Sequence, residues 1–266
     1  MSAEFALRLA SAAAQVLVPE GGKVLIGKDT RVSGYMFESA LEAGFVAAGV
    51  DVLLIGPLPT PGIANLTQVF GADLGVVISA SHNPYDDNGI KFFDGSGAKL
   101  SDDIELNIEA LLKNPAITRE SSSLGRAVRI DTALDRYQEF CRSTFPEDLN
   151  LDEMKVVFDG ANGAGYKVGP KTLNELGASV ISIGCSPNGK NINEDCGSTH
   201  PELLQKTVVA VDAAVGIALD GDGDRIVMVD ELGNIVDGDQ LLYVLASARK
   251  ATGDLDGFLR PSLASV

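Results

Sequence analysis

The feature that most constrains the fold is a pattern of short apolar runs separated by amphipathic stretches, which occurs twice along the chain. In the first half, the apolar runs are Val24–Ile26, Val52–Ile55 and Leu74–Ile78. In the second half, they are Lys155–Asp159, Val180–Ile183 and Ala214–Leu219. Strands that alternate with helices need crossover connections, which favours parallel strands covered by helices. We therefore predict two tandem three-layer α/β/α domains, each with a mostly parallel, mixed sheet.

The helices and the domain boundary follow from periodicity and from turn residues. Helical spacing or terminal residues indicate helices at 4–17, Tyr35–Ala48, from Thr60-Pro61 onward, Ser101–Lys113, Asp131–Cys141, up to Gly177 and from Pro201 onward. Ser33 is a candidate N-cap for the second of these helices. The polar stretch 114–127 is expected to be a surface connection. The segment Pro146–Asn150 separates a first domain, 1–146, from a second domain, 151–266.

The first loop of chemical interest follows the apolar run Leu74–Ile78. It begins Ser79-Ala80-Ser81-His82-Asn83-Pro84 and ends Asn88-Gly89-Ile90-Lys91, where a return strand, Ile90–Phe93, starts. A serine, a histidine and a lysine thus lie on a loop at the end of a core strand, where open α/β sheets bind ligands. A tight turn without any function is the alternative, because turns use the same residue types.

The second loop follows the equivalent apolar run of the repeat, Ala214–Leu219. In Asp220-Gly221-Asp222-Gly223-Asp224-Arg225, glycines separate three carboxylates and let the backbone fold them around one point. Close carboxylates repel one another unless a cation lies between them, and oxygen ligands of this kind suit Mg²⁺. Because Ser81 and Asp220 end equivalent strands, we expect both loops to line one cleft.

Two other interpretations of the acidic loop are a solvated turn and an EF-hand calcium loop. Glu231 falls at the twelfth position from Asp220, as an EF-hand requires, but the sixth position is Arg225 instead of glycine. The flanking segments also have the pattern of strands. A separate glycine-rich turn, Gly160–Gly165, lacks the spacing of a dinucleotide-binding fingerprint, so nucleotide binding there is a weaker alternative.

Composition limits the partners and the compartment. The formal charge of -16 argues against nucleic acid and anionic membranes as partners. Three cysteines without CxxC spacing favour reduced thiols in the cytoplasm. Asp212 interrupts the longest apolar run, Val208–Leu219, and the N-terminus lacks the pattern of a signal peptide. We expect a cytoplasmic protein without a membrane span, and homodimerisation is left open.

The segments Ser79–Pro84, Asn88–Lys91 and Asp220–Arg225 resemble the phosphoserine loop and the metal loop of the α-D-phosphohexomutases. The resemblance extends from about Glu4 to about Gly257, and the surrounding residues are most similar to members that act on a hexosamine phosphate. It implies an isomerase that moves a phosphoryl group within a sugar phosphate through a 1,6-bisphosphate. Domains of the phosphoglucomutase type are implied as well.

The resemblance also implies roles for individual residues. Ser81 would carry the phosphoryl group, and Asp220, Asp222 and Asp224 would bind Mg²⁺ together with an oxygen of the phosphoserine. Arg225 would contact phosphate, and Lys91 would exchange a proton with the sugar hydroxyl or contact phosphate. His82, which borders the nucleophile, would shape the loop or take part in catalysis.

Family members look like four-domain proteins, and only their first two domains have counterparts in this sequence. The opening Thr-Asp-Gly-Ile-Arg-Gly motif and the third and fourth domains have none, and the tail Phe258–Val266 departs from the family pattern. We therefore expect a truncated form that is inactive by itself. The alternatives are a non-catalytic remnant that keeps the fold and the Mg²⁺ site, and a related phosphomannomutase or phosphoglucomutase.

Overall fold

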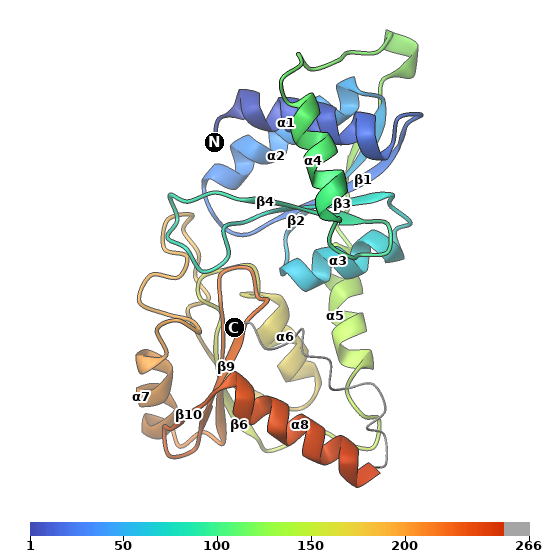
Figure 1. The fold of residues 1–266 in the computed structure, drawn as a ribbon. Coiled ribbons are helices and arrows are strands. Elements are labelled where there is room, and N and C mark those ends of the chain that lie inside the picture. The colour runs from blue at the N-terminus through green and yellow to red at the C-terminus, as the bar shows by residue number, and fades with distance from the viewer. Residues whose placement is uncertain (253–266) are drawn as a thin grey trace.

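Two α/β units, one above the other, make up the computed structural model, which describes residues 1–252 (Figure 1). The expected departure of the tail Phe258–Val266 from the family pattern lies outside these residues. Within them, no helix is long and apolar enough to cross a membrane.

The first unit is built on a five-stranded sheet with the order β4-β3-β1-β2-β5. Its strands are β1 (Gly22–Lys28), β2 (Val50–Pro57), β3 (Leu74–Ile78), β4 (Ile90–Asp94) and β5 (Ala127–Arg129). Strands β1, β2, β3 and β5 are parallel, and β4 runs antiparallel to β3 with Val76 opposite Phe92. The sheet is therefore mixed, with one antiparallel strand at its edge.

Helices cover both faces of this sheet. They are α1 (Ala3–Leu17), α2 (Ser33–Ala47), α3 (Thr60–Val69), α4 (Asp102–Leu111) and α5 (Ala133–Ser143), with a 3-10 turn at Ser121–Ser123. Alternate residues of β1 enter different cores: Val24 and Ile26 pack with α1 and α2, and Leu25 packs with α3 and α5. Burial on both faces explains why the strands are continuously apolar.

The second unit repeats this arrangement in the sheet order β10-β9-β8-β6-β7. Its strands are β6 (Lys155–Asp159), β7 (Ser179–Ile183), β8 (Val215–Leu219), β9 (Ile226–Asp230) and β10 (Ile235–Val236). Strands β6, β7 and β8 are parallel, whereas β9 is antiparallel to β8 and to β10. The series β3-β1-β2 thus corresponds to β8-β6-β7, and the predicted repeat is confirmed.

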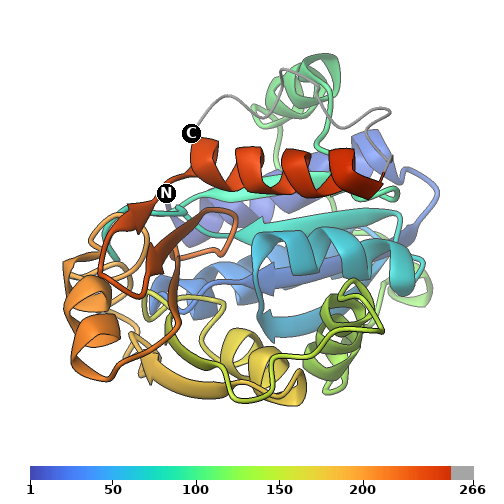
Figure 2. The same ribbon diagram turned by 90° about the horizontal axis from the view of Figure 1, so that it is seen from below.

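The helices of the second unit are α6 (Val168–Glu175), α7 (Glu202–Ala210) and α8 (Gly238–Thr252). Helix α7 packs on β6, β8 and β9, and α6 packs beside β7. Figure 2 shows α8 along the outside of the molecule, where Tyr243 is 74% exposed. The chain therefore carries an apolar helix whose side chains are largely uncovered by residues 1–252.

Most predicted elements are confirmed, including the return strand that begins at Ile90 and the strand that flanks the acidic loop on its C-terminal side, which begins at Ile226; both are antiparallel to the preceding strand. Three details differ. Ser33 is not an N-cap: Val32 precedes the helix, and the Ser33 hydroxyl donates to the side chain of Asn88 instead. The expected surface connection 114–127 leads into the edge strand β5, whose three residues are exposed and carry no periodic signal. The helix α8 and the short strand β10 were not predicted.

The strand order brings the functional loops together. In the first sheet β1 lies between β2 and β3, and in the second sheet β6 lies between β7 and β8. The carboxyl ends of β1 and β3, and likewise of β6 and β8, therefore flank a topological switch point, where α/β sheets bind ligands. Backbone contacts join the two edges: Val32 N donates to Gly189 O at 2.8 Å, and Thr60 N donates to Asp222 O at 2.8 Å.

Candidate functional site

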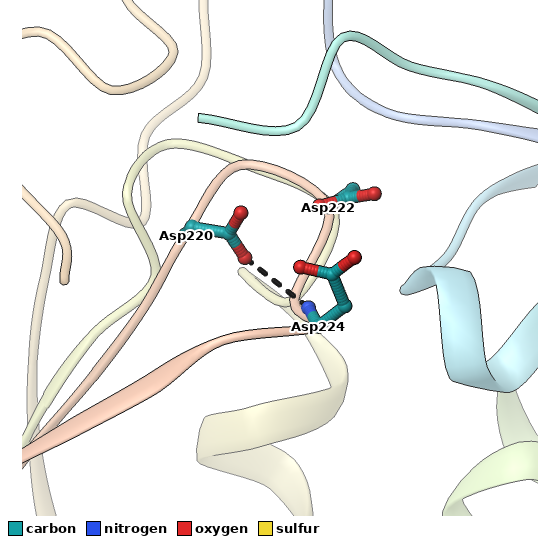
Figure 3. Close-up of side chains that lie close together, drawn as sticks. All are labelled: Asp220, Asp222 and Asp224. Atoms are coloured by element: carbon teal, nitrogen blue, oxygen red, sulfur yellow. Dashed lines mark hydrogen bonds between the residues drawn. The ribbon is translucent and has the colours of Figure 1, made fainter. Parts of the chain in front are cut away.

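Three carboxylates converge at the carboxyl end of β8. One potential ligand oxygen each from Asp220, Asp222 and Asp224 lies within 4.8 Å of the other two. The backbone turns tightly around the cluster, and Asp224 N donates to Asp220 Oδ1 at 3.1 Å (Figure 3). Asp220 and Asp222 are each 1% exposed, whereas Asp224 is exposed. The loop thus places two buried carboxylates and one at the surface around a common point.

The two buried carboxylates differ in their proton affinity. Burial, reinforced by the neighbouring charge of Asp222, raises the pKa of Asp220 to about 6. Burial also acts to raise the pKa of Asp222, but the hydrogen bond and charge of Lys91 outweigh it, so that this pKa is lowered. The cluster without a cation therefore holds one carboxylate that is firmly ionised and one that titrates near neutrality.

Ser81 lies directly against this cluster, although 139 residues separate it from Asp220. Its Oγ donates to Asp220 Oδ2 at 2.7 Å. The Ser81 backbone has a φ of 51°, a left-handed conformation that is unfavourable for residues other than glycine. Its N–H donates to Ser79 Oγ at 3.0 Å, so the preceding serine supports this turn. The structure brings the predicted nucleophile and the predicted metal ligands together.

A residue that the sequence analysis did not single out, Arg31, holds the serine loop in place. The guanidinium is 2% exposed and donates to Ser81 O at 3.0 Å and to Asn83 O at 2.8 Å, with further bonds to the carbonyls of Pro84 and Asp87. Asp29 accepts from Arg31 Nε at 2.8 Å and fixes the guanidinium. The sequence signal that could have identified Arg31 is its place in Asp29-Thr30-Arg31 at the end of β1, because β1 adjoins β3, the strand that leads into the serine loop.

Lys91 reaches the carboxylates from β4. Its Nζ lies 2.7 Å from Asp222 Oδ2 and 3.4 Å from Asp224 Oδ2. Partial burial acts to lower the pKa of Lys91, but the hydrogen bond and charge of Asp222 outweigh this and raise it. Lys91 is therefore an ammonium ion that offsets one negative charge of the cluster. In this state it can donate a proton but cannot accept one.

His82 and Arg225 are not joined to the cluster through their side chains. Both residues are exposed, and neither side chain has a hydrogen-bond or ion-pair partner within residues 1–252. The backbone N–H of Arg225 donates to Asp220 Oδ1 at 3.2 Å, so its position in the loop is fixed while its guanidinium is free to meet a ligand. The predicted roles of these two side chains remain predictions.

The residues present fit a small divalent cation. Asp222 Oδ1 is buried and has no hydrogen-bond partner within residues 1–252, although buried carboxylate oxygens are normally paired. Its other oxygen already accepts from Lys91 Nζ and, at 2.7 Å, from Thr60 Oγ1. An unpaired buried oxygen beside two further carboxylates is the donor set expected for Mg²⁺, which takes oxygen ligands and keeps several waters.

The structure contradicts the EF-hand interpretation of the acidic loop and gives the glycine-rich turn a structural explanation. Strands β8 and β9 flank the acidic loop, whereas an EF-hand requires helices. The glycine-rich turn 160–165 packs against the acidic loop: Ala164 N donates to Gly221 O at 2.8 Å, and a Cβ at Gly163 would collide with the Gly221 backbone. Glycine is thus needed there for close approach of two backbones, which accounts for the turn without a nucleotide.

Comparison with known proteins identifies two domains of one family. Residues 1–118 match the phosphoglucomutase/phosphomannomutase α/β/α domain I, and residues 135–233 match domain II of the same family. The boundary predicted at 146–150 falls within the second match and remains a prediction.

Similar proteins agree with these matches. The chain is 58% identical over 258 residues to a phosphoglucosamine mutase of Chromobacterium violaceum, covering 96% of this chain and 58% of that protein. It is 59% identical over 256 residues to the phosphoglucosamine mutase of Alcanivorax borkumensis, with 96% and 57% covered. The chain therefore spans somewhat more than half the length of these relatives.

Solved structures show the same fold. A phosphoglucomutase/phosphomannomutase family protein from Burkholderia thailandensis superposes with a TM-score of 0.78 at 28% identity, covering 95% of this chain and 56% of that one. A protein described as a putative phosphomannomutase from Thermus thermophilus gives a TM-score of 0.82 at 26% identity, with 95% and 59% covered. The chain belongs to the phosphoglucomutase/phosphomannomutase family, the α-D-phosphohexomutases, and comprises the first two α/β/α domains of that family.

Proposed function

We propose that this chain carries the phosphoserine and metal half of a phosphoglucosamine mutase. The observation that carries the proposal is the approach of Ser81 Oγ to within 2.7 Å of Asp220 Oδ2, which joins a nucleophile from one domain to a carboxylate cluster from the other. The similarity to phosphoglucosamine mutases at 58% identity supports glucosamine 6-phosphate and glucosamine 1-phosphate as the substrate pair. Phosphomannomutase or phosphoglucomutase activity is the alternative to be tested.

In the proposed site, Asp220, Asp222 and Asp224 hold Mg²⁺ together with an oxygen of Ser81 or of its phosphate. The ion would act as a Lewis acid that neutralises charge on the phosphoryl oxygens. Phosphoryl transfer needs mainly positioning and charge neutralisation, and the clamped serine loop supplies the first of these. The exposed Arg225 guanidinium adds a second positive charge that can reach a substrate phosphate.

The transfer has a simple balance of bonds. A hydroxyl of glucosamine 6-phosphate attacks the phosphorus on Ser81, a new P–O bond forms, and the bond between Ser81 Oγ and phosphorus breaks. The hydroxyl proton must leave, with Lys91 as our candidate acceptor, and the Ser81 oxygen must regain a proton when it leaves the phosphorus. Asp222 and Asp224 now keep Lys91 protonated, so it becomes a base only when a cation engages these carboxylates. The 1,6-bisphosphate then returns its other phosphoryl group to Ser81.

The remaining assignments are part of the same proposal. His82 borders the nucleophile on the exposed side and shapes the loop entrance. The three cysteines form no disulfide, which favours the reducing cytoplasm. A hexosamine phosphate is the expected partner, and the acidic charge of -16 disfavours nucleic acid and anionic lipid.

The test is the half-reaction that charges the serine. The chain is incubated with glucosamine 1,6-bisphosphate and Mg²⁺, and phosphorylation is read by intact-mass and peptide mass spectrometry. We expect one phosphoryl group on Ser81, dependent on Mg²⁺ and lost in Ser81→Ala. Ser96→Ala, a hydroxyl whose hydrogen bonds stay within its own turn, is the matched control. Faster charging from glucose or mannose 1,6-bisphosphate would favour the alternative substrates, and no charging from any donor would contradict the proposal.

A further inference from the structure

A residue of the second domain, Asn193, reaches across to the serine loop of the first. It lies in the connection between β7 and α7, and it is 8% exposed. Its Nδ2 donates to Ser81 O at 2.9 Å and to Asn83 O at 3.0 Å, over a sequence separation of 112 residues in the first case. Asn193 is thus the counterpart, from the other domain, of the clamp that Arg31 forms from within the first.

The orientation of the Asn193 amide follows from its surroundings. Exchanging the amide nitrogen and oxygen would place Oδ1 against two carbonyl oxygens, so only the donating orientation is compatible with the site. In that orientation Oδ1 is buried and has no partner within residues 1–252. The amide therefore leaves its oxygen without a hydrogen bond while its nitrogen donates to the serine loop. Because buried amide oxygens are normally paired, this indicates that the contact with the loop determines the position of the Asn193 side chain.

The backbone is also adapted to this contact. Asn193 has a φ of 59°, in the left-handed region that asparagine tolerates better than most residues, and its N–H donates to Ala161 O at 2.8 Å. On the far side of the contact, a Cβ at Gly221 would lie 2.6 Å from Ser81 O and 2.7 Å from Asn193 Nδ2. The Ser81 carbonyl is therefore enclosed by Arg31, Asn193 and the Gly221 backbone.

We propose that Asn193 is a positioning residue that holds Ser81 on the carboxylate cluster. By fixing the Ser81 carbonyl from the second domain, it fixes the left-handed Ser81 backbone, from which Oγ reaches Asp220. Arg31 alone would tie the loop only to its own domain, whereas Asn193 ties it to the domain that carries the carboxylates. The inference rests on the proposed function, because it requires the cluster to bind a divalent cation with a Ser81 oxygen among the ligands.

The test is a double-mutant cycle in which Mn²⁺ affinity is the readout. Free Mn²⁺ is measured by electron paramagnetic resonance during titration of the chain, of Asn193→Gly, of Ser81→Ala and of the double variant. Glycine removes the amide and accepts the positive φ, so backbone strain is not introduced. Asn191→Gly is the matched control, because the Asn191 amide bonds only within its own loop, to Asn188 N and Ser186 O.

We expect Asn193→Gly to raise the Kd for Mn²⁺ about 10-fold, the lower part of the range for groups that orient metal ligands. In the Ser81→Ala background the same change should have no effect, because the ligand that it positions is already gone. Asn191→Gly should bind Mn²⁺ as the unaltered chain does. If Asn193→Gly fails to fold, Asn193→Asp, which keeps the size but turns an oxygen toward the two carbonyls, replaces it in the cycle.

The other outcomes separate the inference from the function on which it rests. An equal loss of affinity in both backgrounds would show that Asn193 only maintains the fold, and no loss in either would show that it positions nothing; each overturns the inference but leaves the metal site standing. Failure of the unaltered chain to bind Mn²⁺ would overturn the proposed metal site and the inference together.

Discussion

Gly221 is the position at which one added methyl group, in Gly221→Ala, should push the serine loop and the acidic loop apart. A Cβ there would lie 2.6 Å from Ser81 O, 2.7 Å from Asn193 Nδ2 and 2.9 Å from Ile192 Cδ1. Ordinary contacts between such atoms are roughly 3.5–4.0 Å, so the serine loop or the acidic loop must move by about 1 Å. The acidic loop cannot retreat, because Ala164 N holds Gly221 O at 2.8 Å on its other side.

The magnitude of the Gly221→Ala effect follows from this displacement. Overpacking of a close-packed site costs about 1–3 kcal/mol, which should appear as a lower free energy of unfolding. A shift of about 1 Å also breaks the 2.7 Å bond between Ser81 Oγ and Asp220, and misplacement on this scale costs on the order of 10²-fold in transfer rate. We therefore expect phosphorylation of Ser81 to fall far more than stability does.

The assay compares the rate of Ser81 phosphorylation with urea unfolding of the same preparations. Gly95→Ala is the control, since its Cβ would lie 3.2 Å from the nearest atom, Ala72 O, and far from the site. Gly95→Ala should charge Ser81 at the unaltered rate. If Gly221→Ala charged Ser81 as fast as Gly95→Ala does, the close approach of the two loops would have no part in the reaction, and the reasoning would be refuted.

Three further predictions concern the charges and hydroxyls around the site. The pKa of Asp220 is raised to about 6, so protons should compete with Mg²⁺ for this carboxylate only below that pH. The Mg²⁺ affinity measured by calorimetry should be constant at higher pH and fall by about tenfold for each pH unit below it. An unchanged affinity at about pH 5 would count against this prediction. Lys28→Met should lower the free energy of unfolding by about 3 kcal/mol, because the buried Glu38 loses the Lys28 Nζ at 2.7 Å and keeps, within residues 1–252, only the Arg129 guanidinium, 3.8 Å away. Mg²⁺ affinity should stay unchanged, and Lys28→Met combined with Glu38→Leu should recover most of the lost stability. Thr60→Val removes the hydrogen bond from Thr60 Oγ1 to Asp222, so it should destabilise the metal-free chain by about 1–2 kcal/mol and also weaken Mg²⁺ binding. The control Thr67→Val loses a hydrogen bond to Ile63 O in the same helix and should lower stability without changing Mg²⁺ binding.

The fold was predictable because the central strands β1, β3 and β6 are buried over nearly all of their residues. Continuous apolar runs marked β1 and β3 of the first domain and β6 and β8 of the second, and the order of strands and helices fixed their parallel arrangement. Ser81 and Asp220 follow equivalent strands of the two sheets, β3 and β8, so a common cleft for both loops could be anticipated as well. The edge strand β5 could not, because its exposed residues have no pattern to distinguish them from a loop.

The residues that hold the site were harder to find than those that act in it. Arg31 and Asn193 donate to backbone carbonyls. Every residue has such a carbonyl, so the sequence does not show which of them accepts from a given side chain. Each residue also has an ordinary local explanation, in a polar turn or in an Asn-rich loop. The strand order makes Arg31 recoverable, since it follows β1, but Asn193 comes from a long connection whose path only the structure shows.

The central claim, that the three carboxylates form a cation site at Ser81, is tested most directly by anomalous diffraction from crystals of this chain soaked in Mn²⁺. The account predicts one strong peak at bonding distance from an oxygen of Asp220, of Asp222 (its Oδ1, which has no partner within residues 1–252) and of Asp224, with Ser81 Oγ facing the ion. In Asp222→Asn the peak should vanish, whereas in Asp230→Asn, a carboxylate that serves only its own turn, it should remain. A peak elsewhere, or a cluster that still pairs with Lys91 and holds no ion, would contradict the account.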